Sequence, residues 1–292
     1  MALRNLLFCL VVAANAQTPY QWDLPAGFPK PRVPADNPMT AAKVELGRYL
    51  FYDRRMSADG KQACASCHIQ NLAFTDGKAR SEGSTGELHP RGSMSLVNVV
   101  YTPTFTWMEQ GLHSLEEQAR IPMFGEHPVE LGVDDRFLDV VRADPKYLKL
   151  FGADPITMDN IIKAIACFER SIVSARTPYD RYHFDRDDTA ISAAAKHGEI
   201  LFFSTGFSCF RCHSGANFTG KPEEVGGYKA PTLRNIAVTA PYMHDGSVKT
   251  LEEAVTHHGT MTGQERADIV EFLHTLTDEA LLHDPRLANP YE

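Results

Sequence analysis

The sequence predicts a mostly α-helical protein built from two similar domains. Apolar residues recur at helical spacing in most segments, and strand signals are almost absent. The pentapeptide Cys-x-x-Cys-His occurs twice, at residues 64–68 and 209–213, and the two copies are 145 residues apart. One copy in each half of a 292-residue chain indicates two domains with one copy in each.

The repeated pentapeptide is typical of covalent haem attachment. Its cysteine sulfurs bond to a haem and its histidine becomes an axial iron ligand. A thioredoxin-like redox pair or half of a zinc site would not explain a histidine directly after the second cysteine in both copies. We therefore expect two c-type haems and two cytochrome-c-like helical domains with a haem-bridging interface between them. The attachment residues are Cys64, Cys67, His68, Cys209, Cys212 and His213.

The N-terminus has the pattern of a secretory signal. Arg4 precedes an apolar run over residues 6–14, and Ala14 and Ala16 form a small-x-small cleavage site. We expect residues 1–16 to be removed and the mature protein to be periplasmic. The apolar run is too short to cross a bilayer and no later run approaches 18 residues, so no membrane span is expected.

The rest of the chain divides into an arm and the two domains. Residues 17–37 are rich in proline and polar residues and predict an extended arm. Residues 38–186 form the first expected domain, and residues 187–292 form the second. The stretch 176–188 looks like the crossing between them. Apolar periodicity predicts helices over 40–51, 114–119, 134–141, 147–151, 157–174, 189–203, 250–258 and 263–276.

Two local patterns refine this assignment. Ser114 and Glu117 have the spacing of a capping box at the start of a helix. Glycine, serine and charged residues dominate 76–94 without any period, which predicts a loop.

Charge and cysteine content exclude some classes of protein. The chain has 37 acidic and 29 basic residues and a net charge of −8, which argues against nucleic acid as a partner. Once the signal is removed, four of the five remaining cysteines belong to the haem motifs. Cys167 is left alone in an apolar helix, where we expect a buried, inert thiol.

The segments around the haem motifs resemble the bacterial dihaem cytochrome c peroxidase and MauG superfamily. The resemblance runs from about residue 38 to 278 and is carried by Trp107, by Leu115-Glu-Glu-Gln118, Pro128-Val-Glu130-Leu, Phe168-Glu-Arg170, Ala230-Pro-Thr-Leu-Arg234-Asn and Thr239-Ala-Pro241-Tyr-Met-His244-Asp-Gly246. The segments 93–98 and 122–132 look closest to the methanobactin-associated branch, MbnH and its relatives. That branch implies hydrogen peroxide as the oxidant and a tryptophan of a secreted or periplasmic partner as the substrate. Such a partner would be a copper-binding, MbnP-like protein.

The resemblance assigns unequal roles to the two haems. The first, on His68, would react with peroxide, and the family's distal glutamate falls on Glu130. A carboxylate suits this position because cleavage of the O–O bond requires a group that accepts a proton and returns it. Trp107 matches the tryptophan that lies between the haems. Polar side chains in the same region, at His89, Arg91 and His127, fit contacts with solvent or with haem propionates better than iron ligation.

The second haem departs from the peroxidases of the family. They place a methionine fourteen residues after the residue that matches His244, and MauG uses a tyrosine in the equivalent role. Here that position is His258, with His257 and Met261 as alternatives. Methionine raises a haem's potential, whereas a second imidazole favours higher oxidation states, so a histidine favours a MauG-type oxidase.

The family also commonly holds a calcium ion between its domains. Thr239 and Pro241 match two of the ligand positions, but Gly92 stands where an asparagine is usual, and Asn98 is a candidate replacement. Calcium prefers oxygen ligands of this kind.

Three functions follow from these observations. The leading one is a peroxide-dependent dihaem oxidase that uses a high-valent dihaem state to convert a partner's tryptophan to kynurenine. The second is a dihaem cytochrome c peroxidase that takes electrons from a small cytochrome or cupredoxin. The third is an electron carrier with two six-coordinate haems, which Glu130 argues against.

Overall fold

The computed structural model describes residues 18–108, 111–220 and 227–292, and the predicted signal peptide, residues 1–16, lies outside these ranges. The described residues form helices and loops with a few isolated β-bridges and no sheet. The predicted mostly α-helical class is confirmed. None of the described helices is long and apolar enough to cross a membrane.

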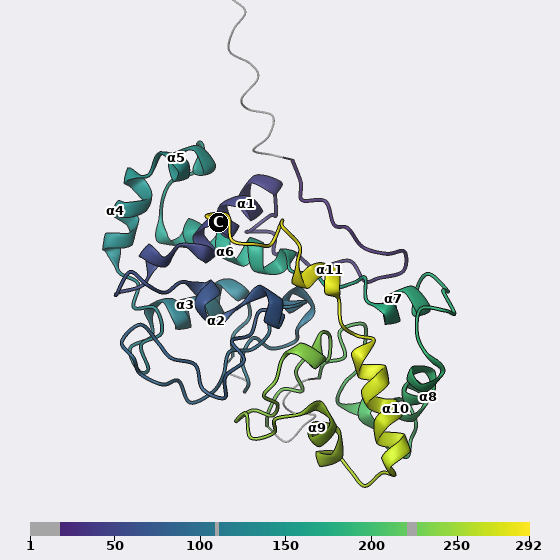
Figure 1. The fold of residues 1–292 in the computed structure, drawn as a ribbon. Coiled ribbons are helices and arrows are strands. Elements are labelled where there is room, and N and C mark those ends of the chain that lie inside the picture. Colours follow the sequence, from purple (N-terminus) through teal and green to yellow (C-terminus); the bar gives the residue numbers. More distant parts are fainter. Residues whose placement is uncertain (1–17, 109–110, 221–226) are drawn as a thin grey trace, which may run out of the picture.

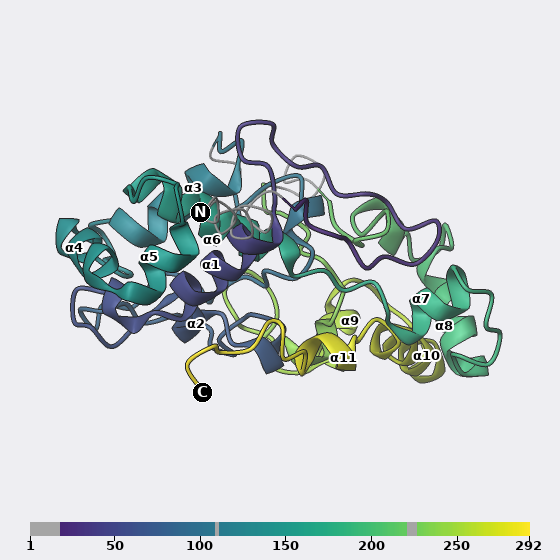
Figure 2. The same ribbon diagram turned by 90° about the horizontal axis from the view of Figure 1, so that it is seen from above.

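Six helices gather at one end of the molecule (Figures 1 and 2). They are α1 (Ala41–Tyr52), α2 (Cys64–Cys67), α3 (Leu115–Phe124), α4 (Asp135–Ala143), α5 (Pro145–Phe151) and α6 (Met158–Ser171). Thr40 begins α1 by accepting a hydrogen bond from the Lys43 N–H, and Thr157 begins α6 in the same way. The apolar face of α6 packs against α1, and Ile161, Ile165 and Phe168 are buried between them.

The remaining helices gather mainly at the opposite end. They are α7 (Pro178–His183), α8 (Ala193–Phe202), α9 (Leu251–His257), α10 (Gly263–His274) and the short α11 (Glu279–Leu282), which lies between the two groups in Figure 1. Helices α8 and α10 pack together around a second apolar core that includes Phe202, Phe218 and Phe272. Short 3-10 turns join the helices at Arg54–Met56, Gln70–Leu72, Val99–Tyr101, Cys209–Arg211 and Ile236–Val238.

Each of the two groups contains a close helix crossing that depends on glycine. A Cβ atom at Gly47 of α1 would lie 1.9 Å from the Ala164 carbonyl oxygen of α6. A Cβ atom at Gly198 of α8 would lie at the same 1.9 Å from the Asp268 carbonyl oxygen of α10. Only glycine allows two helix backbones to approach this closely. Each haem motif therefore follows a helix that is fixed against the closing helix of its own group.

A second shared detail lies after each haem motif. Asn98 and Asn235 both have left-handed backbone conformations, and each precedes a 3-10 turn. The Asn98 N–H donates to Ile172 O, and the Asn235 N–H donates to Leu276 O, both at 2.9 Å. The two halves thus share the same backbone conformation and the same hydrogen bond at this asparagine, although their loops differ in length.

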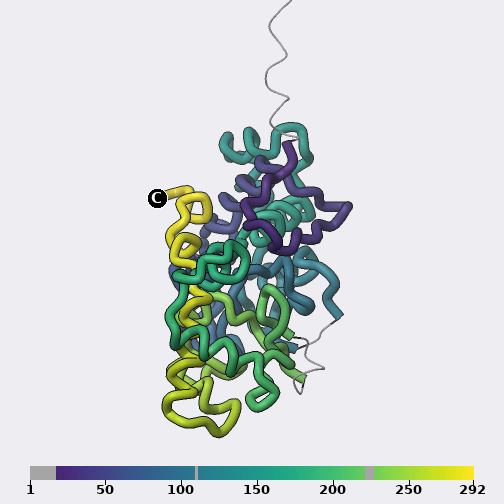
Figure 3. The backbone as a smooth tube through the Cα atoms, turned by 90° about the vertical axis from the view of Figure 1, so that its right-hand side faces the viewer, coloured from purple at the N-terminus to yellow at the C-terminus, as the bar shows by residue number. Residues whose placement is uncertain are grey.

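The chain's last segment returns to the first group. Leu281, Leu282 and Leu287 are buried in the same core as α1 and α6. In Figure 3 the yellow segment runs along one side of the molecule from the second group toward the first. The proposed domain boundary between residues 186 and 187 stays a prediction, and the tail ties the two groups together.

Most predicted helices are present, with three local corrections. The predicted crossing contains α7, which Thr177 and Asp180 begin with a capping box. The helix predicted from 189 begins at Ala193, because the Asp187 carboxylate accepts from both the N–H and the hydroxyl of Thr189 in a turn. Ser114 caps α3, but the Glu117 carboxylate accepts from the His113 N–H instead of closing a capping box on Ser114.

Candidate functional site

The first haem motif occupies the short helix α2 and the residue after it. Cys64 and Cys67 lie one turn apart, and His68 ends the helix. The His68 Nδ1–H donates to Phe74 O at 2.8 Å, which leaves Nε2 as the nitrogen with an available lone pair. Burial lowers the pKa of His68 and keeps the ring neutral. This is the state that an iron ligand needs.

The second haem motif has the same arrangement. The His213 Nδ1–H donates to Phe218 O at 3.2 Å, and burial lowers the pKa of His213 to about 4. Phe74 and Phe218, which supply the two accepting carbonyls, both have positive φ angles, 58° and 48°. A left-handed residue after each motif therefore turns its carbonyl toward the histidine.

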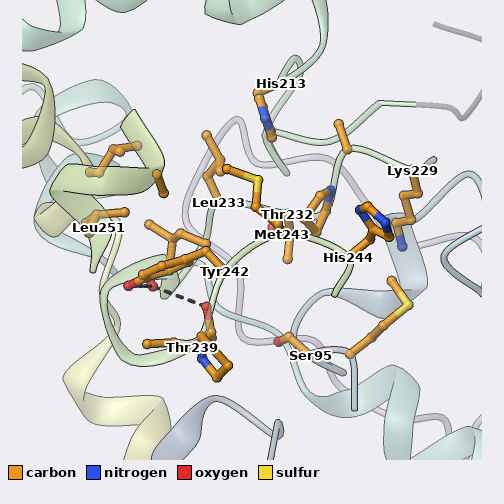
Figure 4. Close-up of a pocket in the computed structure, with 18 of the residues that line it drawn as sticks. Ser95, His213, Lys229, Thr232, Leu233, Thr239, Tyr242, Met243, His244 and Leu251 are labelled. Atoms are coloured by element: carbon orange, nitrogen blue, oxygen red, sulfur yellow. Dashed lines mark hydrogen bonds between the residues drawn. The ribbon is translucent and has the colours of Figure 1, made fainter. Parts of the chain in front are cut away.

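A cavity of about 580 Å³ adjoins the second motif (Figure 4). Its apolar wall includes Leu233, Ile236 and Leu251, and His213 is among the lining residues that Figure 4 labels. Residues 75–79 and 92–95 of the first half also line it. The cavity therefore lies where the two halves of the molecule meet.

His258 faces His213 across this cavity. Their ring centres are 6.4 Å apart, and the His258 Nδ1–H donates to Ala254 O at 2.8 Å, which leaves its Nε2 available. Metal–imidazole bonds of about 2 Å put the centres of two rings on opposite sides of one metal ion roughly 6 Å apart. His257 and Met261 also line the cavity. Met261 packs against the second apolar core.

The polar end of the cavity fits an anionic haem edge. The buried Nε1 of Trp107 has no hydrogen-bond partner among the described residues. Lys229 donates through Nζ to Thr104 O at 2.9 Å and forms no ion pair with a carboxylate in the described part of the chain. Burial lowers the pKa of Lys229 to about 7. An orphaned N–H donor and a cation without a counter-ion suit haem propionates, so the residues present fit the group that Cys209 and Cys212 would attach.

The carboxylate of Glu130 lies near the first motif. Burial dominates the lowered pKa of His68, and the negative charge of Glu130 acts against that shift. His89 contacts Glu130 directly, with its Nε2 3.3 Å from Oε1 of the carboxylate. Glu130 therefore lies on the same side of the molecule as His68. His89, for which the sequence favours a contact with solvent or a haem propionate, instead contacts Glu130.

The other polar candidates lie elsewhere. Arg91 donates to the backbone oxygen of His244 at 3.3 Å and lies over the Tyr228 ring. His127 is exposed. Cys167 is fully buried and its thiol donates to Asn37, and burial raises the pKa of this thiol to about 11, so it stays protonated.

The expected calcium positions are only partly in place. Thr239 and Pro241 line the cavity. A Cβ atom at Gly92 would lie 2.1 Å from Lys78 O, so the family's asparagine does not fit there. Asn98 is no replacement, because its amide group both donates to and accepts from the Ser174 backbone. No cluster of three His, Cys, Asp or Glu side chains suited to a metal ion occurs within the described ranges.

The sequence does not predict the contact of His89 with Glu130 or the position of Lys229, for different reasons. The contact between His89 and Glu130 joins segments that are 41 residues apart, and no local pattern signals it. Lys229 lies one position before a recognised motif, and a single lysine normally indicates exposed surface. A buried lysine becomes informative only once its surroundings are known.

Two covalent haem motifs on an all-helical fold define a c-type dihaem protein, and sequence comparison identifies its family. A sequence model described as "Di-haem cytochrome c peroxidase" matches residues 41–189, and one described as "RoxA-like, cytochrome c-like" matches residues 227–260. The chain belongs to the di-haem cytochrome c peroxidase and MauG family. It is therefore an oxidoreductase of cytochrome-c-like domains, and membership implies two covalent haems and hydrogen peroxide as the oxidant.

Individual relatives cover nearly the whole chain. Cytochrome-c peroxidase IdrP1 of Denitromonas iodatirespirans is 33% identical over 99% of this chain and 98% of its own length. Methylamine utilization protein MauG of Methylorubrum extorquens is 32% identical over 87% of this chain and 83% of its own length. A solved MauG-like protein associated with microbial copper homeostasis is 35% identical, with a TM-score of 0.85 over 94% of this chain and 100% of that protein.

Proposed function

We propose that this chain is a periplasmic, hydrogen-peroxide-dependent dihaem oxidase of the MbnH branch that oxidises a tryptophan of a partner protein to kynurenine. The observation that carries the proposal is the pair of imidazoles, His213 and His258, facing each other across the cavity with ring centres 6.4 Å apart. The similarity to the copper-associated MauG-like protein supports the choice of branch and of a copper-binding, MbnP-like partner.

The identity of the second ligand decides between oxidase and peroxidase chemistry. If His213 and His258 both hold the second haem, its iron would have two imidazole ligands and a lower potential than an iron held by a histidine and a methionine. A low potential favours holding an oxidising equivalent over receiving an electron from a small cytochrome. His258 is favoured over His257 and Met261 because its Nδ1 is bound to Ala254 O, which orients Nε2 for a metal.

Glu130 would supply acid–base chemistry at the first haem. When bound there, the haem supplies iron that accepts the oxidising equivalents of peroxide. The Glu130 carboxylate would accept a proton from one oxygen of hydrogen peroxide and return it to the other oxygen, which leaves as water. A carboxylate is suited to both proton transfers because it can accept a proton and then return it.

Trp107 would carry oxidising equivalents between the two sites. It lines the cavity between the halves, and its carbonyl accepts from the Lys229 N–H at 2.8 Å, which fixes its backbone to the second half. An indole ring has an oxidation potential low enough to relay oxidising equivalents between metal centres. The partner's tryptophan can then be oxidised without reaching the peroxide site.

The overall reaction balances with hydrogen peroxide as the only oxidant. Conversion of tryptophan to formylkynurenine adds two oxygen atoms and consumes two molecules of hydrogen peroxide. One oxygen atom of each peroxide enters the product, and the other leaves as water. Hydrolysis then releases formate and leaves kynurenine.

The acidic net charge of −8 gives no support for a nucleic-acid partner.

The test uses the haem-loaded protein, hydrogen peroxide and a co-expressed periplasmic copper-binding protein as substrate. Mass spectrometry of that partner should show the mass change of tryptophan conversion, and the change should be absent without peroxide. Rapid peroxide turnover with reduced cytochrome or cupredoxin, with an unmodified partner, would instead support the cytochrome c peroxidase reading, which the 33% identity to IdrP1 keeps as the second candidate.

We also propose a calcium ion beside Thr239 and Pro241, where residues 77–79 of the first half approach the second. Gly77 and Gly246 line the same cavity, and a Cβ atom at Gly246 would lie 2.6 Å from Ala79. Removal of calcium with a chelator should lower the thermal stability of the haem-loaded protein, and added calcium should restore it. An unchanged melting temperature, together with no calcium in elemental analysis, would contradict this site.

A further inference from the structure

The segment 81–91, here called the 81–91 loop, folds back on itself and presents His89 at a fixed position. The His89 N–H donates to Ser81 O at 2.7 Å, and the Ser81 N–H donates to Arg91 O at 3.1 Å. The Arg80 guanidinium donates to His89 O at 2.9 Å. Three hydrogen bonds therefore hold the backbone around His89 on both sides.

The same loop is docked on the segment that carries Glu130. The Ser84 N–H donates to Glu130 O at 2.7 Å, and the Ser84 hydroxyl donates to Leu131 O at 3.0 Å. The Val129 N–H donates to the Glu87 carboxylate at 3.1 Å. A Cβ atom at Gly83 would lie 1.8 Å from Val129 O, so glycine permits this close approach. The 81–91 loop is thus hydrogen-bonded to the backbone of Glu130 and of the residues on both sides of it.

The side chains of His89 and Glu130 meet where the two segments dock. His89 Nε2 lies 3.3 Å from Glu130 Oε1, and both side chains are about one-third exposed, 32% and 33%. The Arg91 N–H donates to His89 Nδ1 at 3.4 Å. Because Nδ1 accepts this bond, the proton of the neutral imidazole lies on Nε2 and points at the carboxylate.

The charged groups around the pair act in both directions. The Glu130 carboxylate raises the pKa of His89, whereas partial burial and the Arg91 cation lower it. Glu87 and Arg80 bind the backbone of the two segments. The Glu130 charge also acts on the first haem motif, where it acts to raise the pKa of Cys64, Cys67 and His68.

We propose that His89 is a positioning residue for the peroxide reaction, which holds the Glu130 carboxylate in one orientation by donating Nε2–H to Oε1. This inference rests on the proposed role of Glu130. A donor on one carboxylate oxygen fixes which of the two oxygens faces the substrate. No bond to iron is required of His89, and the residue acts entirely through Glu130.

The experiment measures, by stopped flow at one pH, the second-order rate constant of the ferric, haem-loaded protein with hydrogen peroxide. His89→Ala should slow the reaction roughly 10- to 100-fold, the range for loss of a hydrogen bond to a charged group. His89→Gln, whose amide can also donate, should recover most of the rate. His127→Ala is the matched control, because this exposed histidine lies three positions from Glu130, and its rate should be unchanged.

A second background separates this inference from the proposed function. Glu130→Gln should slow the reaction roughly 10²- to 10⁴-fold, and adding His89→Ala to it should cause no further loss. If Glu130→Gln reacts at the wild-type rate, the proposed role of Glu130 fails. If Glu130→Gln is slow but His89→Ala keeps the wild-type rate, or lowers the rate equally in both backgrounds, only the inference about His89 is overturned.

A structural readout completes the test. A crystal structure of the haem-loaded wild-type protein should keep His89 Nε2 within hydrogen-bonding distance of Glu130. In the His89→Ala structure the carboxylate should adopt a different or mixed orientation while both haems remain attached. An unmoved carboxylate in the His89→Ala structure would contradict the positioning role.

Discussion

Arg234 shows how a single side chain connects the second haem loop to the rest of the molecule. It is 1% exposed, and its two terminal nitrogens donate to the two oxygens of Asp180, each at 2.8 Å. Its Nε donates to Ala216 O at 2.7 Å, two residues before the carbonyl of Phe218 that accepts from His213. The buried ion pair thus fixes the loop that orients an iron ligand.

Asp180→Asn is expected to destabilise the protein by about 3–5 kcal/mol, because it leaves the Arg234 charge buried without its counter-ion. Asp139→Asn is the control, since its ion pair with Arg142 is long, 3.9 Å, and exposed, and the change should cost less than about 1 kcal/mol. Urea unfolding of the haem-loaded variants measures both. Equal effects for the two substitutions would contradict the assigned role of the buried pair.

At the scale of elements, α6 carries a buried acid whose charge acts on the Cys64 thiol of the first haem motif. Glu169 is 6% exposed, and its Oε2 has no hydrogen-bond partner among the described residues. Burial raises its pKa from 4.5 to about 8, whereas the neighbouring Arg170 acts to lower it. The carboxyl group is therefore protonated in the folded protein at neutral pH and ionised in the unfolded chain.

The sign of the pH effect follows from this difference. The unfolded chain releases the Glu169 proton more readily, so its contribution to stability is complete below pH 4.5 and is lost as pH rises toward 8. We expect the free energy of unfolding to fall by roughly 1 kcal/mol per pH unit in this window from Glu169 alone. Glu169→Gln should remove that part of the slope in urea unfolding at pH 5 and pH 8. An identical slope in the variant would show that the buried acid is not its source.

The glycine crossings give an element-scale prediction. Gly198→Ala would place a methyl group 1.9 Å from Asp268 O, so α8 and α10 must separate, at a cost of about 1–3 kcal/mol or more. Gly263→Ala, at the start of α10 with no atom near the added Cβ, should be neutral or stabilising. Thermal unfolding of the two variants compares them. Similar melting temperatures would mean that the helices do not cross this closely.

At the scale of the whole molecule, the sequence predicts what depends on local pattern. The apolar spacing of 157–174 identified α6, and the two Cys-x-x-Cys-His copies identified both attachment sites. The helix α7 was missed although Thr177 and Asp180 carry a capping signal, because the short segment lacks an apolar period.

Features that depend on the docking of distant segments could not be predicted in this way. The contact of His89 with Glu130 requires the 81–91 loop to fold onto residues 129–131. The return of Leu281 and Leu287 to the first core depends on where the chain's tail lies after α10. Asn98 resembled a free oxygen ligand in the sequence, whereas its amide is used to bind the Ser174 backbone.

The central proposal concerns the molecule as a whole: the two haems would be unequal, the first with Glu130 beside it and the second held by both His213 and His258. Electron paramagnetic resonance of the ferric, haem-loaded protein tests this claim most directly. We expect one high-spin signal and one low-spin signal of the bis-histidine type, with the low-spin signal lost in His258→Ala and kept in His257→Ala and Met261→Ala. Two low-spin haems, or a low-spin signal that survives His258→Ala and disappears with Met261→Ala, would contradict it.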